Sequence, residues 1–470
     1  VDIMVFSSLF FLYFFLPLCV IIYASAKKLK TRNNVLLIFS LVFYAWGEPL
    51  CVLLLIASAA VNFVLGLCID KYRDKTGGKI AVTSAVVFDI AMLGIFKYSG
   101  FIVENINAVT HLSLPVPDIR LPIGISFFTF QMISYVIDVH WENVDVQKNY
   151  PKFLMYVSLF PQLVAGPIVR YSTIEAEISN RKTTMDDLYC GFSRLAVGLG
   201  KKVILANNLS TVVDSIFGGD IKSISVLGTW LGAAVYALQI YFDFSGYSDM
   251  AIGMGRIFGF HFDENFNYPF ICKDVSEFWQ RWHISLSTFF RDYLLYVPIF
   301  GKRRKYGGLF LVWFCTGLWH GANWNYIIWG LYFGLFIFLE TKIGKKKMKK
   351  IPLAARHIYN KIVIIIGFGI FYFEDFGKLG NFFKNLIGLN GNGLTDTYSS
   401  LAFSNNFYLI IAALICSFPI AGLIKKASEK SSAVNVAATF MRIPVNLALI
   451  LVSSVMLVDA TNNPFLYFRF

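Results

Sequence analysis

Charge is what this sequence has least of. Asp, Glu, Lys and Arg together make up 15% of its 470 residues, whereas 56% of the residues are hydrophobic and 17% are aromatic. An ordinary soluble domain has about 25% charged and about 45–50% apolar residues. A water-soluble fold with so little charge would have too few polar groups to cover its surface. The composition therefore excludes a disordered chain and a soluble enzyme, and it predicts a polytopic membrane protein.

Paired cysteines and several common catalytic motifs are also absent. The seven cysteines are scattered, mostly within apolar runs, and no Cys-x-x-Cys pair occurs. This pattern excludes a secreted disulfide scaffold, and the cysteines are interpreted as small buried hydrophobic residues. The sequence has no Gly-x-Ser-x-Gly elbow, no zinc-type His or Cys spacing and no Walker loop. We therefore expect no bound metal and no bound cofactor.

Positive charge exceeds negative charge, with 42 Lys and Arg against 29 Asp and Glu and a formal net charge of +13. Most of the excess lies in short clusters between apolar runs, at residues 27–32, 71–79, 201–202, 302–305, 342–350 and 425–430. Such clusters are typical of cytoplasmic loops beside helix ends that contact membrane lipids. Because the clusters are short and separated by apolar segments, we expect no binding of nucleic acid.

The apolar N-terminal stretch 4–26 is interpreted as a first spanning helix and not as a signal peptide. No basic segment precedes it and no small-residue cleavage site follows it. The basic cluster 27–32 comes after it, which predicts an N-terminus outside the cell. Residues 1–3, before Met4, are interpreted as extraneous or upstream-start residues. Residues 4–470 are then expected to form a single membrane domain.

Apolar runs predict the transmembrane helices. A spanning helix needs about 20 apolar residues, so the chain could hold about 11–12 of them. The candidates are residues 5–26, 34–47, 50–68, 80–96, 152–168, 190–206, 224–244, 309–320, 324–341, 357–373, 407–424 and 441–458. Residues 121–140 and 261–305 are too polar to span simply, which predicts interfacial or re-entrant segments around a polar interior. Residues 387–406 are expected to form an exposed loop.

Polar residues within apolar surroundings are candidates for function, because ionisable groups are costly inside a membrane. The stretch Tyr241–Asp249, YFDFSGYSD, places Asp243 and Asp249 in the apolar run 224–260. Six residues apart, these two carboxylates do not share one helix face. The alternative to a functional role is that they pair with Arg or cap a helix that breaks at Gly246.

A second polar cluster is residues 277–293, EFWQRWHISLSTFFRDY. As one helix, it would place Trp279, His283, Leu286 and Phe290 on one face. An amphipathic interfacial helix accounts for this pattern but leaves His283 unexplained.

The third cluster is residues 317–322, GLWHGA, at the end of an apolar run. The small residues Gly317, Gly321 and Ala322 would leave room for a substrate to approach the ring of His320. A histidine with a pKa near neutrality is suited to act as a general base. The alternative is a buried structural histidine.

Taken in order, these motifs resemble the membrane-bound O-acyltransferase family, close to the bacterial branch of the alginate O-acetyltransferase membrane subunit. The match runs nearly end to end. It includes MVFSS from Met4, LPIGISFFTFQ from Leu121, QLVAGPI from Gln162, YFDFSGYSD from Tyr241, NFNYP from Asn265, EFWQRWHISLS from Glu277, GLWHGA from Gly317 and NPFLYFRF from Asn463. The motif core covers about residues 121–341.

The resemblance implies an all-α body of multiple membrane helices around a central tunnel. It also implies transfer of an acyl group, most often acetyl, from a cytoplasmic thioester such as acetyl-CoA to a hydroxyl. An extracytoplasmic SGNH-type acyltransferase partner would then place the group on a polysaccharide. The expected location is the bacterial cytoplasmic membrane.

The family's essential histidine corresponds to His320 and its second polar residue to His283. The resemblance therefore implies that His320 is the general base, and that His283 orients the acceptor or stabilises the oxyanion. Candidates for the tunnel lining are Trp279, Trp282, Ser287, Trp319, Asn267, Asp243 and Gln131. Candidates for the donor's phosphates are Lys302, Arg303, Arg304 and Lys305, together with the cluster 201–202. Membrane topology alone is the alternative explanation of these cations.

Two other functions stay open at this stage. D-alanyl transfer to teichoic acid would use the thioester of a carrier protein in place of free CoA. A transporter or flippase would also carry polar residues at membrane depth, but it should show repeat symmetry between two halves, and none is seen.

Overall fold

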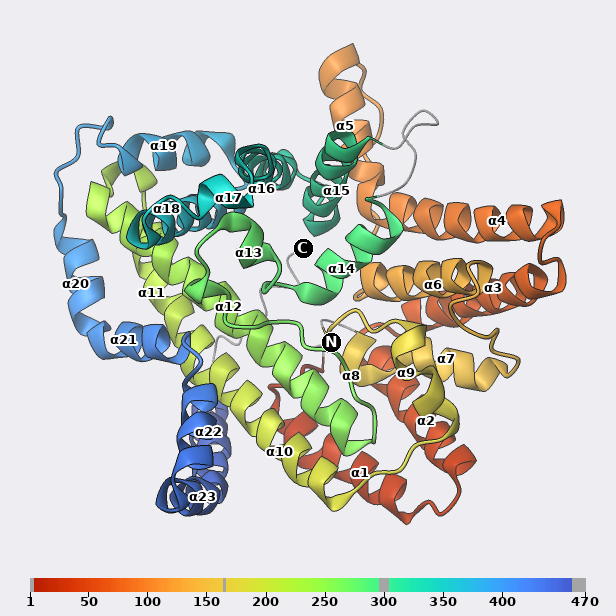
Figure 1. Ribbon diagram of the computed structural model, residues 1–470. Helices are drawn as coiled ribbons and strands as arrows, with labels where there is room; N and C mark the ends of the chain where they lie inside the picture. Colours follow the sequence, from red (N-terminus) through yellow and green to blue (C-terminus); the bar gives the residue numbers. More distant parts are fainter. Residues whose placement is uncertain (1–3, 164–165, 296–303, 459–470) are drawn as a thin grey trace. The chain divides into compact units, whose positions relative to one another are not determined.

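The structure is a computed structural model that describes residues 4–163, 166–295 and 304–458. Within these ranges every regular element is a helix and no β-strand occurs (Figure 1). The predicted all-α class is therefore confirmed. Residues 1–3 and the motif at residues 463–470 lie outside the described residues.

Five helices of the described chain are long and apolar enough to cross a membrane: Cys51–Lys71, Thr76–Thr110, Trp324–Ile343, Leu353–Tyr372 and Ser432–Val458. The bent pair Thr397–Asn405 and Phe407–Cys416 adds a sixth span when the two helices are counted as one. The predicted spans 34–47 and 224–244 correspond to parts of the single helices Leu29–Gly47 and Val226–Ile257, which are not among these five. Some other predicted spans are divided into shorter helices. For example, the stretch 152–168 overlaps two short helices, Tyr150–Ser158 and Phe160–Leu163.

The chain divides into two compact units, and the helices α10 and α12 contribute to both. The first unit comprises residues 1–195 and 247–264. Its elements are η1 (Phe11–Phe15), α1 (Leu16–Ser25), α2 (Leu29–Gly47), α3 (Cys51–Lys71), α4 (Thr76–Leu93), η2 (Gly94–Tyr98), α5 (Ser99–Thr110), α6 (Ile125–His140), α7 (Tyr150–Ser158), α8 (Phe160–Leu163), α9 (Tyr171–Ser179) and most of α10 (Met185–Gly200).

The second unit comprises residues 196–246 and 265–470. Its elements are η3 (Lys201–Ala206), α11 (Asn207–Phe217), η4 (Ile221–Ser223), most of α12 (Val226–Ile257), η5 (Pro269–Ile271), α13 (Val275–Trp279), α14 (Ile284–Tyr293), α15 (Lys305–His320), α16 (Trp324–Ile343), α17 (Lys345–Met348), α18 (Leu353–Tyr372), α19 (Phe376–Leu386), α20 (Thr397–Asn405), α21 (Phe407–Cys416), α22 (Ile420–Lys430) and α23 (Ser432–Val458).

In the first unit, α6 packs against α3 and α4 (Figure 1). The helix begins after Gly124, whose φ of 73° is in the left-handed region that glycine adopts without strain. Almost all of its side chains are buried, including Gln131. On the neighbouring helices, Asn62 Nδ2 donates to Asp89 Oδ1 at 2.8 Å, a buried polar contact of the kind that joins membrane helices. The polar segment 121–140 thus contains a buried helix.

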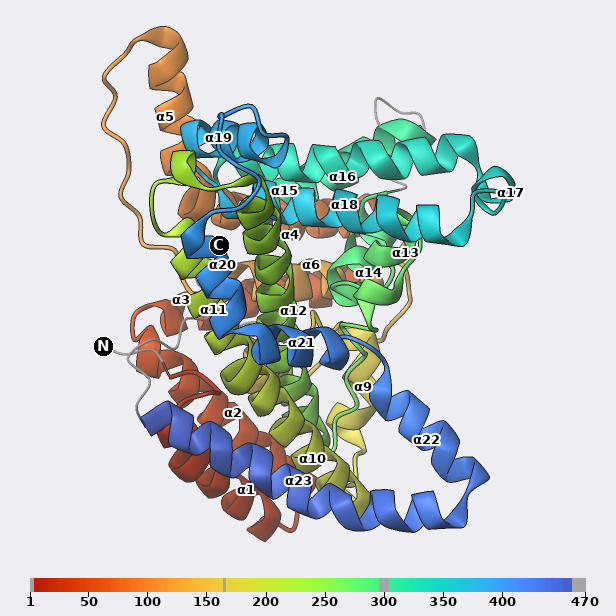
Figure 2. The same cartoon turned by 90° about the vertical axis from the view of Figure 1, so that its left-hand side faces the viewer.

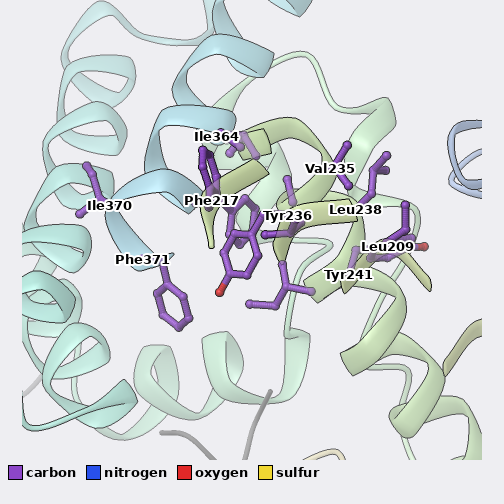
Figure 3. Packing of buried hydrophobic residues seen from close by; sticks show 14 of the residues in the cluster. Leu209, Phe217, Val235, Tyr236, Leu238, Tyr241, Ile364, Ile370 and Phe371 are labelled. Carbon is purple, nitrogen blue, oxygen red and sulfur yellow. The ribbon is translucent and has the colours of Figure 1, made fainter. Parts of the chain in front are cut away.

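In the second unit, α15 and α16 pack at very close range because glycines face the neighbouring backbone. A Cβ atom on Gly330 would lie 2.2 Å from the carbonyl oxygen of Trp313. Helices α16 and α18 lie side by side and are joined at one end by α17 (Figure 2). Side chains of α11, α12 and α18, among them Phe217, Tyr236 and Ile364, gather in one hydrophobic cluster (Figure 3).

The prediction of an exposed loop over residues 387–406 is wrong in its second half. Helix α20 begins there because Asp396 caps it: its Oδ1 accepts a hydrogen bond from the backbone N–H of Ser399 at 2.7 Å. The same carboxylate accepts from the backbone N–H of Ser225 at 3.1 Å and so ties the start of α20 to the start of α12.

His261, to which the sequence assigns no role, joins two helices of the first unit. Its Nδ1 lies 2.7 Å from Glu177 Oε1 on α9, and its Nε2 lies 3.3 Å from Asp187 Oδ1 on α10. Asp187 also pairs with Arg256 of α12 at 3.1 Å. These contacts form a charged network at the surface of the unit.

We expect the thermal stability of the protein to fall with rising pH because of His261. Burial lowers the pKa of His261, but its hydrogen bonds to Glu177 and Asp187 outweigh burial and raise the pKa above its usual 6.5. A group whose pKa rises on folding stabilises the fold while it is protonated. Its contribution is therefore complete below about pH 6.5 and is lost as the pH passes through the higher value of the folded state.

The measurement is the melting temperature of the protein in detergent across the neutral range. His261→Gln can still form hydrogen bonds but cannot be charged, so the fall in melting temperature should be shallower in this variant. The ionisation of Asp187 does not change in this range, because hydrogen bonds from Thr184 and Arg256 outweigh burial and lower its pKa. An equally steep fall in His261→Gln would contradict the assignment.

Candidate active site

His283 stands at a break between two short helices. It follows α13 and a turn, directly precedes α14, and has a φ of 45° in the left-handed region. The prediction of one helix over residues 277–293 is therefore wrong, and Trp279, His283, Leu286 and Phe290 do not share a single helix face. A left-handed non-glycine residue is uncommon and persists only where its surroundings enforce it, most often at functional sites.

The side chain of Asn265 enforces this turn. Its Oδ1 lies 3.1 Å from His283 Nδ1 and accepts from the backbone N–H of Ser285 at 3.2 Å and from Ser285 Oγ at 2.9 Å. The backbone N–H of Ile284 also donates to the carbonyl oxygen of Asn265 at 2.9 Å. One fully buried asparagine thus holds the start of α14 and the imidazole of His283 together.

This arrangement fixes the tautomer of His283. A backbone N–H can only donate, so the atom of Asn265 that faces Ser285 N is the carbonyl oxygen. That oxygen can only accept, so the hydrogen between it and His283 belongs to Nδ1. Burial lowers the pKa of His283, which lies outside the candidate spans, and the ring is therefore neutral. Its Nε2 carries a lone pair and has no hydrogen-bond partner among the described residues.

Aromatic rings cover His283. The ring of Phe244, on α12, meets it edge-on with centroids 4.6 Å apart, and the centroid of Trp319, on α15, lies 5.7 Å away. Only 2% of His283 is exposed.

His320 is the last residue of α15 and is half-buried among three aromatic residues. The centroid of its ring lies 4.8 Å from that of Trp319, 4.9 Å from Trp329 and 5.2 Å from Phe371. Trp319 therefore contacts both histidines, so the structure brings the two predicted catalytic residues to the same tryptophan, although 37 positions separate them in the sequence.

The sequence predicts that small residues beside His320 leave room for a substrate, but at Gly317 and Gly321 this space is already filled. A Cβ atom on Gly317 would lie 2.3 Å from the carbonyl oxygen of Tyr326, and one on Gly321 would lie 2.4 Å from its ring. Helix α16 fills this space. The glycines let α15 and α16 approach each other, which fixes the position of His320 relative to Trp329.

The predicted lining residues have different surroundings. Trp279 is buried, and its ring lies 5.4 Å from that of Trp329. Ser287 Oγ donates to the carbonyl oxygen of Trp279 at 3.2 Å. Trp282 stacks on Phe278 with centroids 5.5 Å apart, within the hydrophobic cluster. Asn267 is exposed and its backbone pairs with Arg281, while Gln131 is buried in α6 of the first unit.

Three residues that the sequence analysis misses hold α13 in place. Glu340, near the end of α16, accepts hydrogen bonds at the start of α13 from the backbone N–H groups of Val275 and Ser276, both at 2.8 Å. Arg356 of α18 pairs with Asp274, with Nε at 2.9 Å from Oδ1. A carboxylate at the N-terminus of a helix is favourable. Glu340 ends an apolar run, and this signal could have identified it.

Lys202 and Asp243 form a buried ion pair. Lys202 Nζ lies 2.5 Å from Asp243 Oδ1, and the two side chains are 2% and 3% exposed. The prediction that the cluster 201–202 binds donor phosphates is therefore wrong for Lys202. Helix α12 also continues through Gly246, so the alternative of a helix that breaks there is wrong. Asp249 pairs with Arg194 at 2.8 Å, which agrees with the other alternative, pairing with Arg.

The other predicted phosphate ligands are partly described. Lys302 and Arg303 lie outside the described residues, whereas Arg304 and Lys305 are exposed at the start of α15. Fifteen helical steps of 1.5 Å place Lys305 about 22 Å from His320 at the other end of this helix. Lys342 of α16 joins this basic end, with its Nζ 4.7 Å from the ring centre of Tyr306. In the described part of the chain, no group of three or more His, Cys, Asp or Glu side chains could hold a metal ion.

Sequence comparisons agree with the resemblance of the motifs. Residues 142–375, which contain both histidines, match the model of the MBOAT, membrane-bound O-acyltransferase family. The probable alginate O-acetylase AlgI of Azotobacter vinelandii is 36% identical over 99% of this chain and 100% of its own length. The peptidoglycan O-acetyltransferase of Helicobacter pylori is 31% identical over 84% of this chain and 82% of its own. The teichoic acid D-alanyltransferase of Bacillus subtilis is 29% identical over 69% of this chain and 88% of its own.

The buried ion pair predicts a large loss of stability in Asp243→Ala. Removing Asp243 takes its carboxylate away from the buried ammonium of Lys202, and loss of one partner of a buried ion pair costs about 3–5 kcal/mol. The double variant Lys202→Met with Asp243→Leu removes both charges and should recover most of this loss. The measurement is the free energy of unfolding in mixed micelles.

Asp292→Ala is the matched control for this prediction. It removes a carboxylate that pairs with Arg291 at the surface, where such pairs contribute about 0–1 kcal/mol. A loss of stability in Asp243→Ala no larger than in Asp292→Ala would show that the buried pair is not needed for the fold.

Proposed function

The chain belongs to the membrane-bound O-acyltransferase family, and we propose that it moves an acetyl group from a cytoplasmic thioester to a hydroxyl acceptor for the O-acetylation of an extracytoplasmic polysaccharide. That it is a multi-pass membrane O-acyltransferase follows from the family and from its apolar helices. The acetyl group, the sides of the membrane and the polysaccharide belong to the proposal. The main observation in support of the proposal is that the ring of Trp319 contacts the rings of both His283 and His320.

His320 acts as the general base in this proposal. The acceptor oxygen attacks the thioester carbonyl as its proton passes to His320, and the carbon–sulfur bond breaks. The leaving sulfur then takes the proton from His320, so the enzyme returns to its starting state. The half-buried position of His320 at the end of α15 supports this role, because the ring is the more accessible of the two histidines.

His283 orients the acceptor. Its Nδ1 hydrogen is bonded to Asn265, so its Nε2 can only accept a hydrogen bond. It therefore receives a hydrogen bond from a donor group of the acceptor, while the reacting hydroxyl gives its own proton to His320. Phe244 and Trp319 pack against the ring of His283, so in this proposal these two side chains flank the bound acceptor.

The donor is a thioester on a long arm, and acetyl-CoA is the proposed form. The cations Arg304, Lys305 and Lys342 lie near one end of the pair of helices α15 and α16, and His320 lies at the far end of α15. A donor whose phosphates bind these cations needs an extended arm to place its carbonyl beside His320. Lys302 and Arg303 belong to the same proposed site. We propose that this basic end faces the cytoplasm, because an excess of Lys and Arg beside helix ends favours the cytoplasmic side.

We place the protein in the bacterial cytoplasmic membrane with its N-terminus outside, and we propose an extracytoplasmic SGNH-type partner that passes the acetyl group to the polysaccharide. The relatives described above are bacterial, and two of the three are named as O-acetyl-transferring proteins. D-alanyl transfer from a carrier protein is the second candidate, because the third relative is named for it. A carrier protein could present the same arm, so activity with free acetyl-CoA separates the two.

His320→Ala should reduce acetyl transfer from acetyl-CoA by about 10²–10⁴-fold, which is the usual contribution of general base catalysis. The measurement is transfer of radioactive acetyl groups in membranes, with protein levels equalised by immunoblot. His357→Ala, on α18, is the control and should keep normal activity. Near-normal transfer by His320→Ala would exclude His320 as the base.

Replacing Lys302, Arg303, Arg304 and Lys305 by Gln should raise the KM for acetyl-CoA and leave kcat nearly unchanged. The effect should shrink as salt rises, because salt screens exposed charges. The control replaces Lys425, Lys426 and Lys430 of α22, a second exposed basic cluster. Equal KM values for the two variants at every salt concentration would contradict phosphate binding by residues 302–305. Membrane topology would then be the explanation of these four cations.

A further inference from the structure

Acyl transfer from a thioester needs a hydrogen-bond donor as well as a base. As the hydroxyl oxygen attacks, negative charge develops on the carbonyl oxygen, and preorganised donors that meet this oxygen supply a large share of catalysis. The requirement rests on the function proposed above. A group of this chain must therefore provide the donor.

His283 does not provide it. The neutral ring has one N–H group, at Nδ1, and that group is bonded to Asn265. The free nitrogen, Nε2, carries a lone pair and would repel a negatively charged oxygen. Of the two roles that the family resemblance leaves open for His283, stabilising the oxyanion conflicts with its hydrogen bonds.

We propose that Trp329 provides the donor, through a hydrogen bond from its indole N–H to the carbonyl oxygen of the acyl group. Trp329 is 2% exposed, and its Nε1 is buried with no hydrogen-bond partner among the described residues. Buried indole N–H groups usually have a partner, because an unpaired one costs about 1–3 kcal/mol. A substrate oxygen would supply the missing partner.

The position of Trp329 selects the carbonyl of the acyl group as this partner. Its ring meets that of His320 edge-to-face, with centroids 4.9 Å apart and planes at 83°. A carbonyl that is attacked by a hydroxyl bound to His320 must lie beside the same ring. Gly330, the next residue, holds this part of α16 against α15 by close backbone contact, so the distance between Trp329 and His320 is fixed by packing.

A second buried indole fits less well. Trp279 Nε1 also lacks a partner among the described residues. Its ring, however, contacts Trp313, Trp329 and Phe333, and no ring contact with either catalytic histidine is found for it in the part of the chain that the structure describes. Trp279 therefore packs behind Trp329 and not against the base.

The proposed step leaves Trp329 unchanged. The oxygen–carbon bond forms, the carbonyl oxygen gains negative charge, and the indole N–H holds that charge without giving up its proton. The carbonyl bond then reforms as the carbon–sulfur bond breaks, and His320 gives its proton to the leaving sulfur. Exclusion of water from this nitrogen strengthens the hydrogen bond.

The test replaces Trp329 by 3-benzothienylalanine, which keeps the shape of the indole and exchanges its N–H for sulfur. Trp329→Phe is a second variant, and Trp313→Phe is the control for loss of ring area within the same group of aromatic residues. The protein is the full chain in nanodiscs. The kcat and the KM for acetyl-CoA are measured from the release of the free thiol during transfer. The melting temperature of each variant is measured as well.

Both Trp329 variants should lose about 10²-fold or more in kcat with a KM close to that of the wild type, as expected for a donor that acts mainly in the transition state. Trp313→Phe should stay within about threefold of the wild-type kcat. Wild-type kcat in the benzothienylalanine variant would overturn the proposal. The two failures are distinguishable: if His320→Ala is inactive while this variant is active, only the role of Trp329 is wrong, whereas an active His320→Ala overturns the proposed function itself.

Discussion

The hydrogen bond between His283 and Asn265 is the constraint on which the rest of the site depends. Three donors converge on one amide oxygen, and the backbone donor among them fixes which atom of Asn265 faces the histidine. This determines the tautomer of His283, its left-handed backbone and the start of α14. The roles of the residues in the proposed mechanism follow from this hydrogen bond. A histidine that can only accept orients the acceptor, and the stabilising donor has to come from another residue.

Uninterrupted apolar runs were sufficient to predict helices. Residues 50–68 and 324–341 correspond closely to α3 and α16, because a long apolar stretch in a membrane protein has to satisfy its own backbone hydrogen bonds. The break at His283 could not be predicted. Helical periodicity in residues 277–293 describes side chains, whereas the break is imposed by Asn265, which is distant in sequence. The helix at Thr397 was missed although Asp396, its capping residue, is a readable signal.

The two histidines were predicted from their motifs, but their partners were not. Asn265 lies in the quoted motif NFNYP, yet only the fold shows that its side chain reaches His283. The same holds for charge. The composition shows an excess of cations without showing that Lys202 is buried against Asp243 or that Arg356 is bound to Asp274. Glycines beside His320 were interpreted as space for a substrate, whereas α16 occupies it. Residue type indicates chemistry, and packing decides where each group is used.

The central claim is that the acyl carbonyl is held beside His320 while the donor's phosphates bind at the other end of α15. The most direct measurement is a cryo-electron microscopy map of the protein with a non-hydrolysable acetyl-CoA analogue in which a methylene ketone replaces the thioester. The account predicts density for the phosphates near Arg304 and Lys305, and a carbonyl oxygen roughly 3 Å from the indole nitrogen of Trp329. A carbonyl bound away from His320, with Trp329 and His320 both far from the ligand, would contradict the account.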